Sequence, residues 1–237
     1  FVANWKMFGN LRNLTSLSKV VTFAKKYKKN KFKIIYCPPT TLIYPLSKNL
    51  GYNSIELGGQ NCHESDSYGS NTGQINSAML KDVGARYVIL GHSENRKLGE
   101  NDELINSKIK SSLKSGLKVI FCIGETLKQK RKKITRKVLV NQIMKGLKKV
   151  KNKKKILIAY EPVWAIGSGL IPREKDLFET IKYIKKQVKG VKVLYGGSVN
   201  HKNINSLKKI DNLDGFLIGG ASQVANNFID IIKKTFN

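Results

Sequence analysis

The sequence has 237 residues and 41% hydrophobic residues, which fits one large domain or two small ones with a substantial core. It contains no apolar run close to the length of a membrane span, and its start lacks the pattern of a secretory signal. Its three cysteines, Cys37, Cys62 and Cys122, are widely spaced without a CxxC pattern, which argues against a disulfide scaffold or a zinc site and favours a reducing compartment.

The charge balance is unusual, because 44 Lys and Arg residues against 16 Asp and Glu residues give a formal net charge of +28. Such a charge raises nucleic-acid binding as a hypothesis. The main basic runs, 25–33, 128–133 and 148–155, are expected at helix ends and in connections, scattered over the surface, and no base-stacking or zinc-finger pattern accompanies them. We therefore expect mostly solvated surface and no specific nucleic-acid partner, with attraction of a small anionic substrate as a second reading.

Short runs rich in β-branched and aromatic residues recur along the chain, and most end in Gly, Pro, Cys or a polar residue. This pattern is typical of buried strands. In chain order the expected strands are 1–5, 33–37, 54–60, 87–91, 118–124, 155–162, 191–197 and 215–220.

The segments between these runs show helical spacing. Residues 101–116 place Leu104, Ile105, Ile109 and Leu113 on one face and stop at Gly116, as a helix end does. Residues 173–188 and 221–236 repeat the pattern.

Alternation of strand and helix at about 30 residues per unit predicts a parallel sheet with helices outside. Eight such units without a linker or a change in composition favour a single α/β domain, a (β/α)8 barrel over residues 1–237. An open, doubly wound sheet is the alternative that the spacing leaves open.

The residues that directly follow the strands are the ones to read for chemistry, since active sites of such barrels lie at the carboxyl ends of the strands. Polar and small residues gather there: Asn4 and Lys6 after the first run, His92, Ser93 and Glu94 after the fourth, Glu161 after the sixth, Gly196, Gly197 and Ser198 after the seventh, and Gly219 and Gly220 after the eighth.

This set suits removal of a proton next to a carbonyl. A carboxylate such as Glu161 can act as the base, and a cation with hydrogen-bond donors can stabilise the enolate oxygen. Glycine turns expose backbone N–H groups that bind phosphate. The segment "PVWAIGSG" (162–169) has the design of a closing loop that keeps water out.

Each residue alone has a simpler interpretation. A histidine after a strand is more often a hydrogen-bonded structural residue, a glutamate before proline a turn carboxylate, and one lysine in this basic chain carries little information. Cys37 and Cys122 are most simply packed, small apolar residues. The joint position of His92, Glu161 and Lys6 at strand ends is what favours a site.

Six ordered blocks then identify a resemblance: "ANWKM" (3–7), "ILGHSENR" (89–96), "CIGETL" (122–127), "AYEPVWAIGSG" (159–169), "YGGSV" (195–199) and "GFLIGGAS" (215–222). Together they strongly resemble the triosephosphate isomerase family over essentially the whole chain. The resemblance implies a TIM barrel and an aldose–ketose isomerase of glycolysis and gluconeogenesis. It implies interconversion of dihydroxyacetone phosphate and D-glyceraldehyde 3-phosphate through an enediolate, with no metal and no organic cofactor.

The resemblance also implies roles for single residues. Glu161 matches the base that moves the proton, His92 the neutral electrophile, and Lys6 the substrate-binding cation, with Asn4 beside it. The phosphate-binding set is matched by Gly167, Ser198, Gly219 and Gly220.

Four further residues match supporting positions of the family. Glu94 matches a buried acid behind the histidine and the lysine, and Ser93 a residue that holds the base while the lid is open. Trp164 matches the lid hinge, and Glu125 its partner in the open state.

Members of the family are mostly homodimers, in which a polar loop reaches into the neighbouring subunit. Here that loop is residues 61–74, and Thr72 matches the residue that meets the partner's Asn4 and His92. Asn95 and Gln74 occupy two positions that form an ion pair across the family's interface, so the resemblance predicts a hydrogen bond in its place, because both charges are lost together.

Two more departures concern the surface and the lid. The family's mostly acidic run after "CIGETL" is the basic run 128–133 here, which is expected to touch the outer surface and not the site. The lid ends in "GLIP" (169–172), shorter than in many members. We therefore expect a cytoplasmic enzyme, against the alternatives of a nucleic-acid-binding barrel and of a catalytically inactive scaffold.

Overall fold

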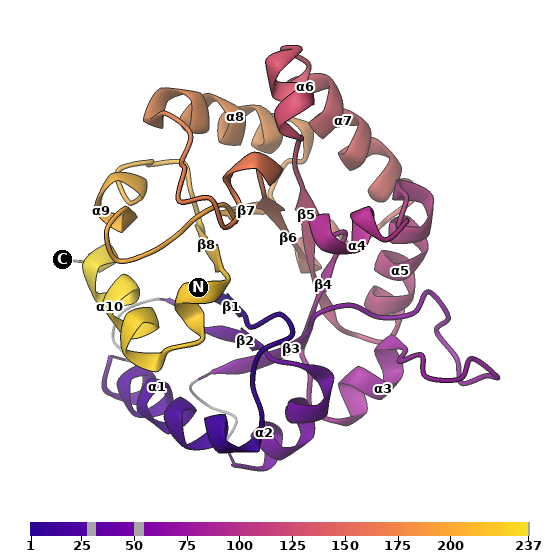
Figure 1. The fold of residues 1–237 in the computed structure, drawn as a ribbon. Coiled ribbons are helices and arrows are strands. Elements are labelled where there is room, and N and C mark those ends of the chain that lie inside the picture. Colours follow the sequence, from indigo (N-terminus) through magenta and orange to yellow (C-terminus); the bar gives the residue numbers. More distant parts are fainter. Residues whose placement is uncertain (28–31, 50–54, 237) are drawn as a thin grey trace.

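A computed structural model describes residues 1–27, 32–49 and 55–236 of the chain. Its strands β1 to β8 are all parallel and pair in chain order, and β8 closes against β1 to complete a barrel. Helices surround the barrel on the outside (Figure 1). The predicted (β/α)8 architecture is therefore confirmed, and the open sheet is excluded. Parts of two sequence features, the basic run 25–33 and the strand expected at 54–60, lie outside the described residues.

The strands are shorter than the runs that predicted them. They are β1 (Val2–Asn4), β2 (Ile35–Cys37), β3 (Glu56–Gly59), β4 (Tyr87–Leu90), β5 (Lys118–Ile123), β6 (Ile156–Tyr160), β7 (Lys192–Tyr195) and β8 (Gly215–Ile218).

The α-helices follow the strands in alternation, with extra short helices at several loops. They are α1 (Leu14–Lys26), α2 (Ile43–Asn49), α3 (Ser77–Asp82), α4 (Ser93–Lys97), α5 (Asp102–Lys114), α6 (Leu127–Arg131), α7 (Thr135–Gly146), α8 (Glu174–Gln187), α9 (Ile204–Leu207) and α10 (Ala225–Phe236). Single turns of 3-10 helix are η1 (Leu11–Asn13), η2 (Thr40–Leu42), η3 (Lys153–Lys155), η4 (Val163–Ala165) and η5 (Gly220–Ser222).

The strands are apolar on both faces, because each face meets a different core. Alternate residues such as Tyr87 and Ile89 of β4 point into the barrel and form one hydrophobic cluster. Their neighbours Val88 and Leu90 pack outward with the helices in a second cluster. This period-two division explains why the runs read as continuous hydrophobic segments and not as alternating ones.

Helix α5 shows how local sequence sets the helix bounds. The side chain of Asn101 accepts a hydrogen bond from the Leu104 amide and caps the start of the helix. Ile105 and Ile109 are completely buried against the barrel, and the chain leaves the helix at Gly116 with a φ of +87°. The helix predicted at 101–116 is confirmed, with bounds one or two residues shorter.

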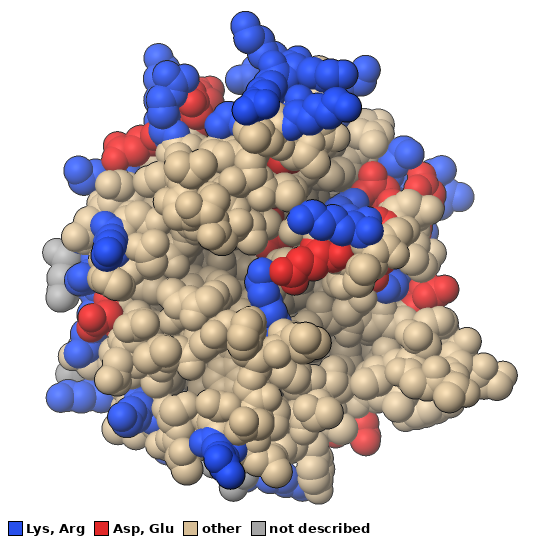
Figure 2. All heavy atoms as spheres, viewed as in Figure 1, with Lys and Arg blue, Asp and Glu red and all other residues tan. Residues whose placement is uncertain are grey.

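Two surface features of the barrel bear on function. The connection between β3 and α3 projects away from the barrel (Figure 1). Basic side chains gather at the rim of the face shown in Figure 2, over the part of the molecule where Figure 1 places α6 and α7. The run 128–133 was expected at a helix end or in a connection, but most of it forms α6 itself, which a Thr126–Gln129 capping box starts.

No helix in the described parts of the chain combines the length and the apolar character needed to span a bilayer.

Candidate active site

A cavity of about 340 Å³ opens at the carboxyl ends of the strands, the face seen in Figure 2. Strands from all parts of the chain contribute to it, since all of them end at this side of the barrel. The cavity is lined by every residue that the sequence proposed for catalysis or substrate binding: Asn4, Lys6, His92, Glu161, Gly167, Ser198, Gly219 and Gly220.

The start of helix α4 sets the orientation of the His92 ring. Its Nδ1 atom accepts a hydrogen bond from the Glu94 backbone N–H at 3.2 Å, so the ring proton is assigned to Nε2. The side chain is buried, and Nε2 lies 3.3 Å from Oε1 of Glu161. The imidazole therefore presents a hydrogen-bond donor toward the cavity.

Glu161 follows β6 and is 3% exposed. Its Oε2 atom is buried without a hydrogen-bond partner among the described residues. Burial raises the pKa of this carboxyl, and the neighbouring His92 and Lys6 act in the opposite direction. A carboxylate with one unpaired oxygen and a raised pKa is suited to accept a proton.

Two glycines give the Glu161 segment its place. A Cβ on Gly124 would lie 1.8 Å from the Glu161 carbonyl oxygen, and a Cβ on Gly196 would lie 2.7 Å from Cγ of the same residue. Neither position has room for a larger residue, so the glycines that follow β5 and β7 allow the close approach of the carboxylate to His92.

Lys6 lies beside this pair on a strained backbone with a φ of +55°. Asn4 accepts the Lys6 amide proton at 3.0 Å, and the side chain of Gln60 donates to the Lys6 carbonyl at 2.9 Å. Nζ forms an ion pair with Oε1 of Glu94 at 2.6 Å. Three contacts from different elements thus fix the position of this cation at the cavity.

Glu94 differs from its expected setting. It was expected to be a buried acid, but its side chain is 53% exposed in this single chain. Burial acts to raise the pKa of the Glu94 carboxyl, yet the hydrogen bond and the charge of Lys6 lower it overall. Glu94 therefore remains an anionic partner of Lys6.

The lid segment lies over the cavity. The Gly169 amide donates a hydrogen bond to Oγ of Ser198 at 3.0 Å, and at the other end the Trp164 indole donates to Oε1 of Glu125 at 2.9 Å. The family resemblance predicted that the Trp164–Glu125 pair and a contact between Ser93 and Glu161 belong to the open lid. Here the Trp164–Glu125 bond coexists with the lid–Ser198 bond, and Glu161 faces His92, while no Ser93–Glu161 hydrogen bond occurs among the described residues.

The basic run 128–133 reaches the lid, which corrects the expectation that it touches only the outer surface. Nζ of Lys130 lies 3.3 Å from the centroid of the Trp164 ring. An ammonium group at this distance from an indole face forms a cation–π contact.

Sequence reasoning missed three contributors to the site. Gln60 supports Lys6, and its only signal was its position at the end of an expected strand. Lys130 was hidden in a basic run. Cys122 was interpreted as a packed apolar residue and is indeed fully buried, but burial and the nearby Glu161 charge raise its thiol pKa well above the usual value.

The proposed interface residues lie away from the cavity of this single chain. Thr72 and Gln74 are exposed on the projecting loop, and Asn95 is partly exposed on α4. They do not line the cavity.

No group of three or more His, Cys, Asp or Glu side chains that could hold a metal ion occurs in the described residues.

Comparisons with known proteins agree on one family. A family model described as triosephosphate isomerase matches residues 1–235. Triosephosphate isomerase of Thermodesulfovibrio yellowstonii is 42% identical over 242 residues, covering 98% of this chain and 97% of the relative. That of Dictyoglomus thermophilum is 39% identical over 245 residues, with the same coverage of each chain. A crystal structure of triosephosphate isomerase from Bartonella henselae superposes with a TM-score of 0.89 at 34% identity, covering 100% of this chain and 98% of that one.

Proposed function

The chain belongs to the triosephosphate isomerase family and interconverts dihydroxyacetone phosphate and D-glyceraldehyde 3-phosphate, and we propose that Glu161, His92 and Lys6 carry out this reaction. The observation that carries the proposal is the convergence of a buried carboxylate, an imidazole 3.3 Å away and a fixed cation in one 340 Å³ cavity. The reaction belongs to glycolysis and gluconeogenesis in this family.

Substrate binding uses both sides of the cavity. Backbone amides near Gly167, Gly219 and Gly220 and the hydroxyl of Ser198 form its neutral, donor-rich side, which suits a phosphate dianion. The carbonyl end of the substrate then lies between His92 and Lys6. The Asn4 side chain accepts a hydrogen bond from the Lys6 backbone amide and adds a polar group to the lining of the cavity.

Proton transfer follows from this orientation. The Glu161 carboxylate removes a proton from the carbon next to the carbonyl, and the electron pair of that C–H bond moves to form an enediolate. The Nε2–H of His92 and the ammonium of Lys6 stabilise the oxygen that gains negative charge. The proton of the other hydroxyl then moves to this oxygen by way of Nε2 of His92, while Glu161 returns its proton to the neighbouring carbon. No atom is gained or lost, and both side chains are restored.

The lid gives the intermediate its protection. The Gly169–Ser198 hydrogen bond joins the lid tip to the phosphate side of the cavity. A lid in this position excludes water from the enediolate phosphate, which would otherwise lose phosphate. Trp164 and Glu125 act at the hinge, and Ser93 and Glu94 support the two catalytic side chains.

The test is an isomerisation assay on D-glyceraldehyde 3-phosphate, coupled to NADH-dependent reduction of the dihydroxyacetone phosphate formed. The wild-type chain should show turnover, and Glu161→Gln should lose about 10² to 10⁴-fold of kcat, the range that a positioned base contributes. Glu103→Gln on the exposed face of α5 serves as the matched control and should match the wild type. Near-normal kcat in Glu161→Gln would contradict the assigned base.

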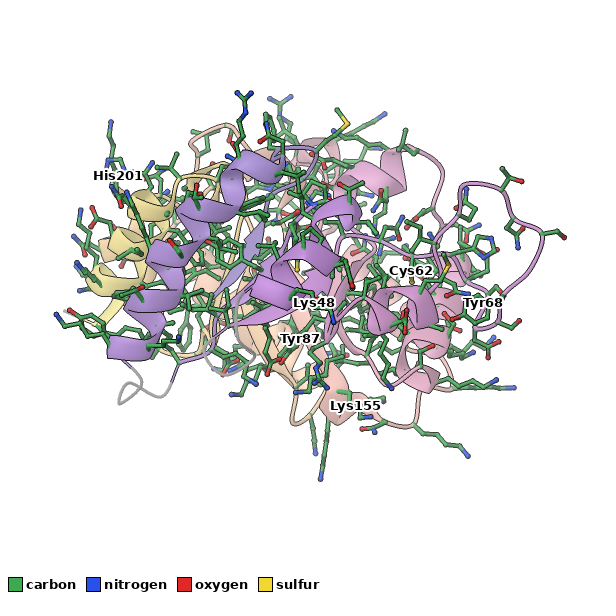
Figure 3. All side chains as sticks on the ribbon, turned by 90° about the horizontal axis from the view of Figure 1, so that it is seen from below. Lys48, Cys62, Tyr68, Tyr87, Lys155 and His201 are labelled. Carbon is green, nitrogen blue, oxygen red and sulfur yellow. The ribbon has the colours of Figure 1, made fainter. Side chains whose placement is uncertain are left out.

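We further propose that the enzyme is a single-domain, cytoplasmic homodimer. Large apolar side chains are exposed after β1, after α4 and on the projecting loop, among them Met7 (95%), Leu98 (86%) and Tyr68 (74%). Figure 3 shows Tyr68 far out on this loop. Such a surface favours burial against a second copy. In that arrangement Thr72 of one subunit would approach Asn4 and His92 of the other, and Glu94 would be covered.

Sedimentation at several concentrations tests the dimer. In the proposed contact Asn95 meets Gln74 of the other subunit through a hydrogen bond. Asn95→Arg would place a cation there without an acidic partner, so it should weaken the dimer. Unchanged dissociation in that variant would reject the contact, and a monomeric wild type would reject the dimer itself.

A further inference from the structure

The outer helix α6 and the lid meet at one aromatic ring. We propose that Lys130 is a positioning residue of this isomerase, whose ammonium group stacks on Trp164 and holds the start of the lid in the position in which the lid tip meets Ser198. The inference rests on the proposed function of the lid, which it deepens by naming a residue outside the cavity that controls it.

The Trp164 side chain is fixed on two sides. Its ring face lies 3.3 Å from Nζ of Lys130, and its Nε1–H donates to Oε1 of Glu125 at 2.9 Å. Tyr160 donates to the same carboxylate at 3.1 Å. The indole is thus held on its edge by an anion and on its face by a cation, an arrangement that defines both its place and its tilt.

The position of Lys130 is itself defined by the helix that bears it. Thr126 and Gln129 form a capping box at the start of α6, and the Lys130 amide donates to the Thr126 carbonyl at 2.9 Å. The backbone of Lys130 is therefore fixed by the start of α6. In the described part of the chain, it is the one basic residue with a cation–π contact to Trp164.

Lys130 also acts on the carboxylate below the ring. Burial raises the pKa of Glu125, while the hydrogen bonds from Trp164 and Tyr160 and the charge of Lys130 act to lower it. The lysine thus helps to keep Glu125 an anion, the form that accepts both hydrogen bonds.

The contact matters for the site because the lid is short. Trp164 lies in the turn η4, three residues after the base Glu161 and five before Gly169. The same turn is tied down by the Val163 amide, which donates to the Glu125 carbonyl at 3.0 Å. A shift of the indole would therefore move the lid tip away from Ser198.

Three variants separate the stacking contact from the charge of α6. Lys130→Met keeps the aliphatic stem and removes the cation, and Lys130→Arg keeps a cation that stacks on aromatic faces. Lys128→Met removes the same charge from the same helix but no contact with Trp164. Both positions are exposed, so the three variants should fold.

Acrylamide quenching of tryptophan fluorescence reports the contact without using activity. Trp5 is 2% exposed and bonded to the Ser222 carbonyl, so the quenchable emission comes from the partly exposed Trp164. Lys130→Met should increase quenching and raise KM about two- to fivefold at nearly constant kcat, since a weaker lid loosens ground state and transition state alike. Lys130→Arg should restore both values, and Lys128→Met should match the wild type.

Two results would overturn the inference: quenching and KM in Lys130→Met equal to those in Lys128→Met, or a Lys130→Arg variant that behaves like Lys130→Met. Failure of the proposed function is a different result, because a wild type without isomerase turnover would still show the quenching difference.

Discussion

The two ends of the barrel contain hollows of opposite character. The hollow at the carboxyl ends of the strands has about 340 Å³ and brings together Glu161, His92 and Lys6. The hollow at the other end is larger, about 670 Å³, and its polar lining is mainly lysine, including Lys154 and Lys155. Figure 3 shows Tyr87 and Lys155 toward this second end. Size and charge therefore do not identify the active site, whereas the convergence of complementary groups does.

The lysine-rich end has a structural explanation. Helices of the barrel finish at this end, and their last turns carry lysines such as Lys114 of α5, Lys185 of α8 and Lys233 of α10. Cations near a helix C-terminus are stabilised by the partial negative charge of its carbonyls. Part of the net charge of +28 is thus placed where it stabilises helices, away from the site.

The same substitution made at both ends is the strongest test of this difference. Glu161→Asp shortens the side chain by one methylene and so withdraws the carboxylate from the substrate. A displacement of about 1 Å can lower a rate about 100-fold, so kcat should fall by about that factor or more, with little change in KM. Glu56→Asp shortens a carboxylate at the lysine-rich end, which is paired with Lys33 at 2.7 Å, and should leave kcat unchanged. Steady-state kinetics of the pair decide, and equal losses would break the comparison.

Glycine substitutions sharpen the comparison at the level of packing. In Gly196→Ala the new Cβ would meet Cγ of Glu161 at 2.7 Å, so the base must move, and kcat/KM should fall about tenfold or more. Gly190 lines the other hollow with a φ of +76° and open space around it. Gly190→Ala should lower the unfolding free energy by about 1 kcal/mol through backbone strain alone.

Activity assays and thermal melting distinguish these two outcomes. Gly190→Ala should shift Tm down by about 2–4 °C and keep kcat/KM. An active Gly196→Ala variant, or an inactive but stable Gly190→Ala variant, would reverse the assignment of the two ends.

The pH dependence of Glu161 gives a third test, with activity and stability changing in opposite directions. An ordinary Glu carboxyl has a pKa of about 4.3. Because burial raises the pKa of Glu161, the acid limb of the kcat/KM profile should lie at a higher pH than that value. A carboxyl with a raised folded pKa contributes stability that is present below its unfolded pKa and is lost as pH rises through the folded value. Glu161→Gln should therefore gain in Tm over the wild type at pH 8 and not at pH 4.

Glu103→Gln is the control with the opposite sign. A hydrogen bond from Lys145 lowers the pKa of Glu103, so its ionised form is favoured in the fold and its replacement should give no gain at pH 8. Equal Tm values for wild type and Glu161→Gln at both pH values would show that burial of the ionised Glu161 carboxylate does not lower the stability of the fold.

Much of this arrangement could be predicted from the sequence, for a physical reason. Parallel strands joined by helices all point the same way, so residues that follow the strands must meet at one end. That rule alone placed Lys6, His92 and Glu161 together. Strand bounds were less accurate, as in β1, where 1–5 was expected and Val2–Asn4 was found, although the Phe1 carbonyl and the Trp5 amide still form backbone hydrogen bonds with β2.

The contacts that the sequence did not reveal depend on long side chains from separate elements. Gln60 reaches Lys6 and Lys130 reaches Trp164 across distances that no spacing along the chain encodes. The tautomer of His92 likewise depends on one backbone amide of α4. Exposure of Glu94 was missed for a related reason, since residue type alone does not say what covers a side chain.

The smallest effect is expected from charge at the lysine-rich end. Lys155 precedes β6 and Glu161 follows it, so the five residues of the strand separate them by about 20 Å. The Debye length at 0.15 M ionic strength is about 8 Å, so charges at this end are screened from the cavity. The double variant Lys154→Gln/Lys155→Gln should therefore leave kcat/KM unchanged at 0.15 M ionic strength. At 0.01 M, where the Debye length is about 30 Å, it should lower kcat/KM at most about twofold. Lys6→Gln, which removes one charge at the cavity itself, should cost more at both salt concentrations. A salt-independent loss in the double variant would show that the lysine-rich end takes part in the reaction.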